Sequence, residues 1–253
     1  MRAKNWQKPL PWLVVAALLV LWEVCVRAFD VPLYVLPGPV DVLDALFTDA
    51  GTLLPHALVT SSEAALGMLI ALVLGLLLGV AMDAFPVVRR CLYPILVVTQ
   101  TVPMIVLAPI LIIYLGFGMA PKILTVVLMC FFPVAVNFTD GMSQVDKGYV
   151  DLVRSYGASR AQTYALVKLP AALPPLFSGL RVAATYSISG AVVGEWIGSQ
   201  RGLGYYLLRV KESYMLDKVF ACVVVIIVLS LLMNGIVRLC QYIFLPFLRR
   251  AKG

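Results

Sequence analysis

Residues 219–237 read VFACVVVIIVLSLLMNGIV and contain no charged side chain. A helix needs roughly 20 predominantly apolar residues to cross the hydrocarbon core of a membrane. A second uncharged run covers 93–121. Neither run alternates apolar and polar residues, as a strand of a membrane barrel would. Because a chain inside lipid must satisfy its own backbone hydrogen bonds, these runs predict transmembrane α-helices.

The composition of the whole chain agrees with a membrane protein. Of its 253 residues, 62% are hydrophobic and 13% are charged, and the mean hydropathy is +0.96. Soluble domains average about 45–50% apolar and about 25% charged residues, so a soluble fold would have no interior large enough for this excess. We therefore expect an all-α integral membrane protein with six transmembrane helices, at 10–29, 57–82, 92–115, 122–141, 174–195 and 218–245.

Positive charges predict the orientation of these helices, because Lys and Arg are enriched in cytoplasmic loops. With the N-terminus inside, cytoplasmic segments hold 12 of the 20 Lys and Arg residues, and outer segments hold five. The first outer loop, 30–55, holds none of them and carries four aspartates. We therefore expect both termini in the cytoplasm. The placement of the positive charges also argues against a nucleic-acid partner, despite a net charge of +7.

Two segments depart from the pattern of continuous apolar helices. One lies in the first outer loop, and the other lies within an expected transmembrane helix. After Leu36-Pro-Gly-Pro39, apolar residues recur at helical spacing and predict a short amphipathic helix on the membrane surface: Val40, Leu43, Leu46 and Phe47. The helix expected at 92–115 carries Pro94, Pro103 and Pro109. These prolines are either harmless kinks or the mark of a broken segment that lines a pathway.

The cytoplasmic segment 142–173 carries the most local information. Tyr149, Leu152, Val153 and Tyr156 share one helical face. Gly157 follows, where a helix C-terminus favours positive φ. Ser159 with Gln162 three residues later is a capping box, so a second helix should begin there, carry Tyr164, Leu166, Val167 and Leu169, and end at Pro170. The pattern predicts two short helices around a glycine elbow, whose apolar side chains meet either a partner or the membrane surface.

This segment resembles the EAA motif of binding-protein-dependent ABC importer permeases, E-A-A-x3-G-x9-I-x-L-P. Asp151 stands at the Glu position, and Leu152 and Val153 replace the two alanines. Gly157 and the Leu169-Pro170 pair keep the spacing. The resemblance implies an ATPase-coupling loop made of Asp151, Leu152, Val153, Tyr156, Gly157, Ala158, Ser159, Tyr164, Leu166, Val167, Leu169 and Pro170.

Other stretches are similar to the taurine, nitrate, sulfonate and thiamine-pyrimidine-precursor branch of the same family. They include Gln100-Thr-Val-Pro103, Leu115-Gly-Phe-Gly118, and Glu195 with Arg201-Gly-Leu-Gly204. The resemblance covers essentially the whole chain. It implies a type I ABC importer permease fold in one domain, 1–253. An N-terminal helix and outer amphipathic segment would occupy 1–56, and a permease core 57–245.

The same resemblance implies the partners and the location. Such permeases work in the bacterial cytoplasmic membrane as multi-pass proteins, surrounded by lipid. The coupling loop seats in a cleft of a cytoplasmic ATPase dimer, a second permease copy completes the channel, and a substrate-binding protein docks outside. The chain itself lacks a GxxxxGK[ST] phosphate loop, has no CxxC pair among its five cysteines, and has one histidine, His56. We therefore expect no enzyme activity and no cofactor on this chain, with ATP bound by the partner.

Polar and conformationally special residues in the expected spans are candidates for the pathway or its gate: Gln100, Pro103, Pro109, Asn137, Ser187 and Glu195. The polar ones among them could equally make helix–helix hydrogen bonds. The outer loop expected at 195–217 offers candidate contacts for the binding protein, with an aromatic belt at the membrane surface as the alternative: Arg201, Gly202, Gly204 and Tyr205.

Residues 194–220 look most like permeases for pyrimidine precursors of thiamine, such as a hydroxymethylpyrimidine. A sulfonate, taurine or another small heteroaromatic compound is the alternative substrate. The rival class is a secondary transporter, which should show an inverted repeat and buried coupling charges. An intramembrane enzyme should show a paired nucleophile and base or clustered ligands in mid-span. Neither pattern is evident in this sequence.

Overall fold

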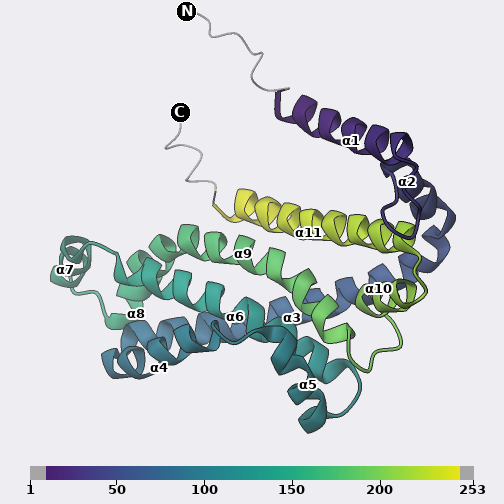
Figure 1. Ribbon diagram of the computed structural model, residues 1–253. Coiled ribbons are helices and arrows are strands. Elements are labelled where there is room, and N and C mark those ends of the chain that lie inside the picture. Colours follow the sequence, from purple (N-terminus) through teal and green to yellow (C-terminus); the bar gives the residue numbers. More distant parts are fainter. Residues whose placement is uncertain (1–9, 246–253) are drawn as a thin grey trace, which may run out of the picture.

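A computed structural model describes residues 10–245, and all of its regular elements are helices (Figure 1). The terminal charges used above to predict the orientation lie outside the described residues: Arg2, Lys4, Lys8, Arg249, Arg250 and Lys252. The elements in chain order are α1 (Leu10–Ala28), α2 (Pro39–Thr48), α3 (Ala50–Ala84), α4 (Pro86–Thr99), α5 (Met104–Leu115), α6 (Met119–Ser143), α7 (Lys147–Ser155), α8 (Arg160–Thr163), the π-helical turn η2 (Tyr164–Lys168), α9 (Leu169–Glu195), α10 (Leu203–Glu212) and α11 (Leu216–Phe244).

Within residues 10–245, five helices are long and apolar enough to cross a membrane: α1, α3, α6, the continuous helix Arg160–Glu195, and α11. The sixth candidate span is the pair α4 and α5, which bends by 104° at its break. The prediction of one continuous helix over 92–115 is therefore wrong, because two helices, α4 and α5, cover this stretch. Pro103, which has no N–H to donate, stands directly before α5, and the chain changes direction there.

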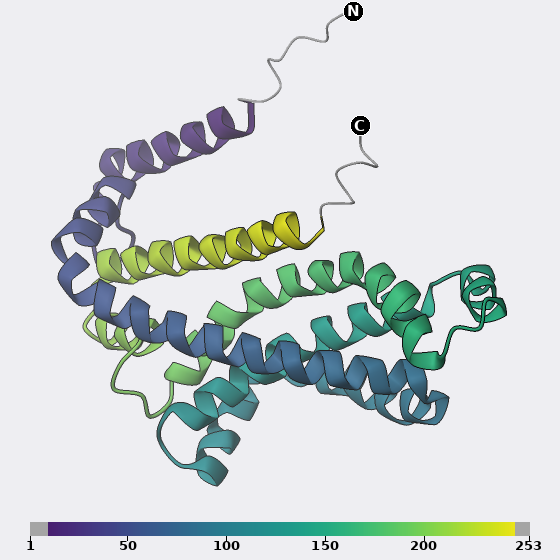
Figure 2. The ribbon, with the colours of Figure 1, turned by 180° about the vertical axis from the view of Figure 1, so that it is seen from behind.

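Three helices, α3, α6 and α9, form the centre of the bundle. Small residues recur at every fourth position of α3 on the side that faces α6: Gly67, Ala71, Gly75 and Gly79. A Cβ atom on Gly67 would lie 2.5 Å from the Cβ of Val126, and one on Gly75 would lie 2.7 Å from Cγ1 of Val134. Because small residues let two helix backbones approach closely, this stripe fixes how α3 crosses α6 (Figure 2).

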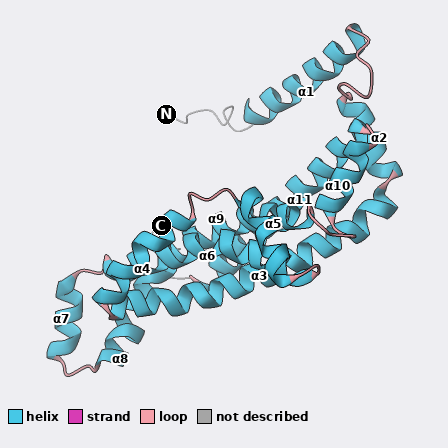
Figure 3. Cartoon of the chain, turned by 60° about the horizontal axis from the view of Figure 1, so that its bottom comes forward, coloured by secondary structure: helices cyan, strands magenta, loops and turns pink. Residues whose placement is uncertain are grey.

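Helix α1 stands away from this centre and contacts the rest of the chain near its C-terminal end (Figures 1 and 3). Val26 is its one buried residue, and the Arg27 guanidinium bridges Glu23 at 2.9 Å and Asp41 at 2.7 Å. The predicted amphipathic helix of the outer loop is confirmed as α2. Its Val42 and Ala45 pack against α11, while Val40, Leu43 and Phe47 remain exposed.

Segment 142–173 contains the two predicted short helices, α7 and α8, which project from one end of the bundle (Figure 3). The prediction that Pro170 ends the second helix is wrong, because the chain stays helical from Arg160 to Glu195. The π-helical turn η2 lies just before that proline, and its closing bond runs from Leu169 N–H to the Tyr164 carbonyl oxygen. A π-turn absorbs the hydrogen bond that proline cannot make, and the helix continues.

Candidate functional sites at the two ends of the bundle

The elbow between α7 and α8 has the backbone geometry that the sequence predicts. Helix α7 begins at Asp146, whose carboxylate accepts a hydrogen bond from Gly148 N–H at 2.7 Å. The helix ends at Ser155, and Gly157, two residues later, has a φ of +85°. Gly157 N–H donates to the Arg154 carbonyl at 2.9 Å, and Ala158 N–H donates to the Val153 carbonyl at 3.2 Å. These bonds close the last turn, and the positive φ that they require favours glycine.

The capping box at the start of α8 is also confirmed. Ser159 Oγ accepts from Gln162 N–H at 3.3 Å, and Gln162 Oε1 accepts from Ser159 N–H at 2.8 Å. Elbow and cap together fix the direction in which α8 leaves the loop.

The two helices expose apolar surface that the bundle does not cover. Tyr156 is 86% exposed and Leu166 is 67% exposed. Of the predicted coupling residues, the exposed ones are Asp151, Leu152, Tyr156, Gly157, Ser159 and Leu166. The partly buried ones are Val153, Ala158, Tyr164, Val167, Leu169 and Pro170. Exposed aromatic and aliphatic side chains outside a membrane bundle are typical of an interaction surface.

Tyr164 lies differently from the expectation that it belongs to that surface. Its hydroxyl donates to Asp83 Oδ2 on α3 at 2.5 Å, and its ring packs against the bundle core. Lys168 Nζ also reaches Asp83 Oδ2, at 2.6 Å. Sequence reasoning missed Asp83, because its partners lie more than 80 positions away and no local spacing marks it.

At the opposite end, Glu195 is buried and joins three helices. Its Oε1 accepts from the Thr60 hydroxyl on α3 at 2.6 Å, and its Oε2 accepts from Gly204 N–H at the start of α10, also at 2.6 Å. Thr60 in turn accepts from Leu203 N–H at 2.8 Å, and His56 Nδ1 accepts from Gly202 N–H at 2.9 Å. These residues are called the outer cluster below, after the side of the membrane on which the sequence analysis predicts this end: His56, Thr60, Glu195, Gly202, Leu203 and Gly204.

The tyrosine that follows on α10 ties this end to the α2–α3 turn. The Tyr206 hydroxyl donates to Asp49, and Lys218 Nζ lies 3.6 Å from the same carboxylate. Burial alone would raise the pKa of Asp49, but the hydrogen bond from Tyr206 and the charge of Lys218 outweigh it and lower that pKa. Burial and the neighbouring carboxylate raise the pKa of Tyr206, so its hydroxyl remains the donor.

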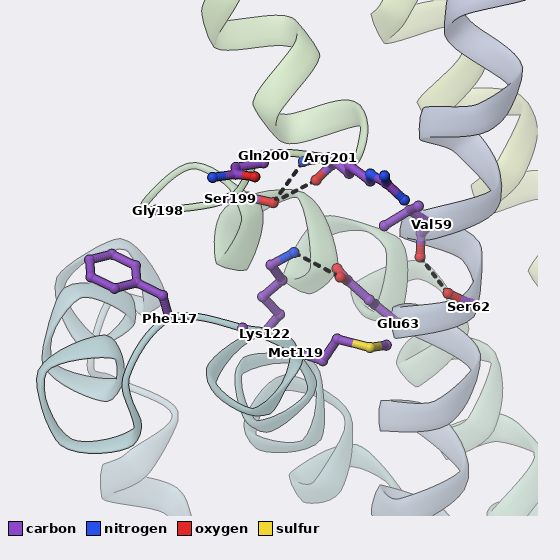
Figure 4. A pocket seen from close by; sticks show the side chains of 11 residues that line it. Val59, Ser62, Glu63, Phe117, Met119, Lys122, Gly198, Ser199, Gln200 and Arg201 are labelled. Carbon is purple, nitrogen blue, oxygen red and sulfur yellow. Dashed lines mark hydrogen bonds and ion pairs between the residues drawn. The ribbon is translucent and has the colours of Figure 1, made fainter.

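Beside the outer cluster, Lys122 Nζ contacts Glu63 Oε1 at 2.9 Å, with both side chains almost fully buried. They line a cavity of about 990 Å³ between α3, the α5–α6 turn and the segment after α9, and Figure 4 shows them pointing toward one another. From sequence alone, a carboxylate near the end of a span could also reach the membrane surface. Burial of Glu63 against Lys122 excludes that for this residue, and removing either partner would leave an uncompensated charge.

The predicted pathway residues are dispersed. Gln100 and Pro103 line one cavity of about 260 Å³ at the α4–α5 break, together with Tyr186 of α9. Pro109 lies within α5. Asn137 donates to the Pro133 carbonyl at 2.7 Å, and the buried Ser187 donates to the Ala184 carbonyl at 2.9 Å. Glu195 belongs to the outer cluster, so in this structure it serves as a link between helices.

Of the four predicted contacts with the binding protein, two are buried and two are not. The loop expected at 195–217 contains α10, and Gly202 and Gly204 are buried in the outer cluster. A Cβ on Gly202 would lie 2.2 Å from Glu195 Cδ, so these glycines let the backbone approach the carboxylate and do not face a partner. Arg201 is exposed and lines the large cavity, and the Tyr205 ring lies 5.9 Å from His56. Of the four predicted contacts, Arg201 and Tyr205 are the ones that are not buried.

Comparison with known proteins identifies the family. Residues 71–244 match the family described as binding-protein-dependent transport system inner membrane component. The chain belongs to this family. It is thus the permease subunit of an ABC importer, a multi-pass inner-membrane protein that works with an ATPase and a substrate-binding protein. The permease is not an enzyme, since ATP hydrolysis belongs to the partner, and the rival of a secondary transporter is excluded.

Several curated permeases resemble the chain over most of its length. A probable ABC transporter permease protein of Haemophilus influenzae is 36% identical over 87% of this chain and 90% of its own. The formylaminopyrimidine transport permease protein ThiX of Halalkalibacterium halodurans is 32% identical over 98% of this chain and 99% of its own. The taurine transport system permease protein TauC of Escherichia coli is 33% identical over 91% and 86%.

Among solved structures, an amino acid ABC transporter matches with a TM-score of 0.64 and 16% identity, over 78% of this permease and 95% of that chain. The MetNI methionine ABC transporter in an inward-facing form matches with a TM-score of 0.53 and 20% identity, over 74% and 93%. At these identities the likeness shows the fold alone. It confirms the predicted ABC permease fold.

Proposed function

We propose that this permease imports a pyrimidine precursor of thiamine, of the formylaminopyrimidine or hydroxymethylpyrimidine type. One observation carries the proposal: ThiX matches the permease from end to end, over 98% of this chain and 99% of its own. Residues 194–220 also resemble permeases for pyrimidine precursors of thiamine. This segment forms the outer end of the bundle through Glu195, Arg201 and α10.

A second substrate class also has direct support. TauC is 33% identical, and the putative aliphatic sulfonates transport permease protein SsuC of Bacillus subtilis is 32% identical over 94% of this chain. These identities equal or slightly exceed the 32% of ThiX, and the shares of their own lengths that are covered, 86% for each, are smaller than the 99% of ThiX. A sulfonate is therefore the alternative that a substrate experiment must distinguish.

We also propose how the importer assembles around the two ends of the bundle. Both termini and the α7–α8 segment lie in the cytoplasm, where the exposed Leu152, Tyr156 and Leu166 seat against an ATPase subunit. Two identical permease copies pair with an ATPase dimer, and the remaining apolar helix faces contact lipid. The binding protein docks at the outer end, near Arg201 and Tyr205. ATP closes the ATPase dimer, and the moving coupling segments open the permease pair outward.

Complementation and uptake test the substrate together. The permease is expressed with its ATPase and binding protein in a strain that neither makes the pyrimidine nor takes it up. The strain should grow on hydroxymethylpyrimidine or formylaminopyrimidine, and it should accumulate the labelled compound without competition from excess taurine. Growth on thiamine is the control, since thiamine bypasses the requirement. Uptake of taurine or an alkanesulfonate, without uptake of either pyrimidine, would replace the proposed substrate by the alternative.

A further inference from the structure

The inner end of α3 carries a buried carboxylate that no motif in this chain identifies. Asp83 is the second-last residue of α3, and its side chain is only 4% exposed. Its Oδ2 accepts from the Tyr164 hydroxyl at 2.5 Å and from Lys168 Nζ at 2.6 Å. These two residues are the first and last of η2, so one carboxylate holds both ends of the π-helical turn.

The coupling segment has few other attachments to the bundle. Helix α7 exposes most of its surface, and the segment projects beyond the neighbouring helix ends (Figure 1). Among the polar side-chain contacts of the described residues, those that join 144–168 to a different part of the chain all end on Asp83. The segment is also joined covalently to α6 and to α9, and the Tyr164 ring packs against the bundle core. Asp83 is therefore the polar link between the coupling segment and α3.

Helices α3 and α9 meet again at the outer end. Thr60 of α3 donates to Glu195 of α9, and Glu63 of α3 lies beside them against Lys122. The 20 positions from Glu63 to Asp83 span about 30 Å at 1.5 Å per residue, which is the thickness of the hydrocarbon core. A movement of α8 thus reaches the outer cluster by two routes, through α9 by covalent continuity and through α3 by way of Asp83.

We propose that Asp83 is the positioning residue that makes α3 follow the coupling segment, so that α3 and α9 move together and the outer cluster shifts as a unit. This role rests on the proposed docking of α7–α8 to an ATPase. Without the Asp83 contacts, α9 alone would follow α8, and the motion would be lost at the α3 side of the outer cavity. A carboxylate suits the role, because a charge-assisted bond to Lys168 and a bond from Tyr164 resist displacement better than neutral bonds.

The test uses the full complex in proteoliposomes and needs no substrate. Spin labels on Ser62 of α3 and Ser199 beyond α9 report the outer cavity, in a background without the five native cysteines. Binding of ATP should change their distance in the parent protein. In Asp83→Asn the fraction of molecules that makes this change should fall about tenfold, the factor for one lost charge-assisted hydrogen bond, while ATP hydrolysis stays within about twofold.

A matched control and a mutant cycle make the result specific. Asp140→Asn removes the contact of Asp140 with Arg89 at 3.0 Å, which does not involve the coupling segment, and should behave as the parent. Lys168→Met should resemble Asp83→Asn, and the double variant should be no worse than either single one. If Asp83→Asn does not assemble, Lys168→Met carries the same test.

Three outcomes would overturn the role of Asp83. These are an unchanged distance response in both variants, a parallel loss of hydrolysis and response, and additive effects in the cycle. Parallel loss would assign Asp83 to seating the ATPase. A parent complex that hydrolyses ATP with no distance change would instead contradict the proposed assembly, so the two failures are distinguishable.

Discussion

Substitution of Gly157 tests whether the α7–α8 segment couples this permease to an ATPase. The residue has a φ of +85°, and a Cβ atom placed there would meet nothing within 4 Å. A side chain at this position therefore adds backbone strain without a steric clash. An L-residue in the left-handed region costs about 1–2 kcal/mol, and a β-branched residue reaches about 3 kcal/mol.

These energies predict an order of effects. An exposed segment that packs little against the bundle has a local stability of only about 1–2 kcal/mol. Gly157→Ala should therefore lower the ratio of formed to open elbow by roughly fivefold, and Gly157→Val should lower it by roughly thirtyfold or more, since each 1.4 kcal/mol is a factor of ten. Gly157→Asn should stay close to the parent, because Asn tolerates positive φ and its side chain has open space.

The assay separates coupling from insertion. Each variant is quantified in the membrane, then purified with its ATPase, and both ATP hydrolysis and binding-protein-dependent uptake are measured. Gly157→Val should be present at parent level, yet lose the ATPase or hydrolyse ATP without uptake. Gly51→Ala is the control, since Gly51 also has no neighbour within 4 Å but has no positive φ. Normal uptake by membrane-inserted Gly157→Val would refute the coupling role, and an Asn variant as impaired as Val would refute the strain argument.

Three further predictions concern topology and the outer end. Single cysteines at Thr48 and Ser213, which are exposed, should react with a membrane-impermeant thiol reagent from outside, and one at Ser159 should not; labelling of Ser159 from outside would invert the orientation. Gly202→Ala should lower the stability of the purified permease by about 1–3 kcal/mol through backbone strain at its φ of +107°, and contact of the new Cβ with Glu195 should lower it further. Gly116→Ala is the control, because it has the strain without the contact. Equal melting temperatures for the two variants would contradict the role of the contact. Arg201→Glu should weaken binding-protein-stimulated ATP hydrolysis more than basal hydrolysis, and a parallel change in both would remove the docking role.

The effect of each proline on its helix could not be predicted from the sequence alone. The sequence analysis considered four prolines as possible breaks or ends of helices, and of these only Pro103 stands at a break. Pro94 and Pro109 lie inside α4 and α5, and Pro170 lies inside a continuous helix after a π-turn. A proline inside a helix removes one backbone hydrogen bond, and neighbouring helices in a membrane can compensate for that loss. Whether the helix breaks therefore depends on packing that local sequence does not contain.

The elbow and cap of the coupling segment could be predicted because each depends on residues within a few positions of one another. The buried contacts of α3 could not, because Glu63 and Lys122 are 59 positions apart, Asp83 and Lys168 are 85 apart, and Thr60 and Glu195 are 135 apart. From sequence, an ionisable residue near the end of a span either reaches the membrane surface or serves function. Burial decides between these readings for Glu63 and Asp83, since neither carboxylate is exposed.

The position of these contacts on one helix has a mechanical consequence. A helix held by buried side chains at a single end can tilt or slide at the other, whereas α3 is held at both ends, by Asp83 inside and by Thr60 and Glu63 outside. Because the side chains of Asp83, Thr60 and Glu63 are themselves buried, releasing one of these contacts leaves a buried polar group unpaired, which costs more than losing an exposed bond. Displacement of α3 at the coupling segment is therefore favoured as a rigid shift over local bending, and it reaches the outer cavity.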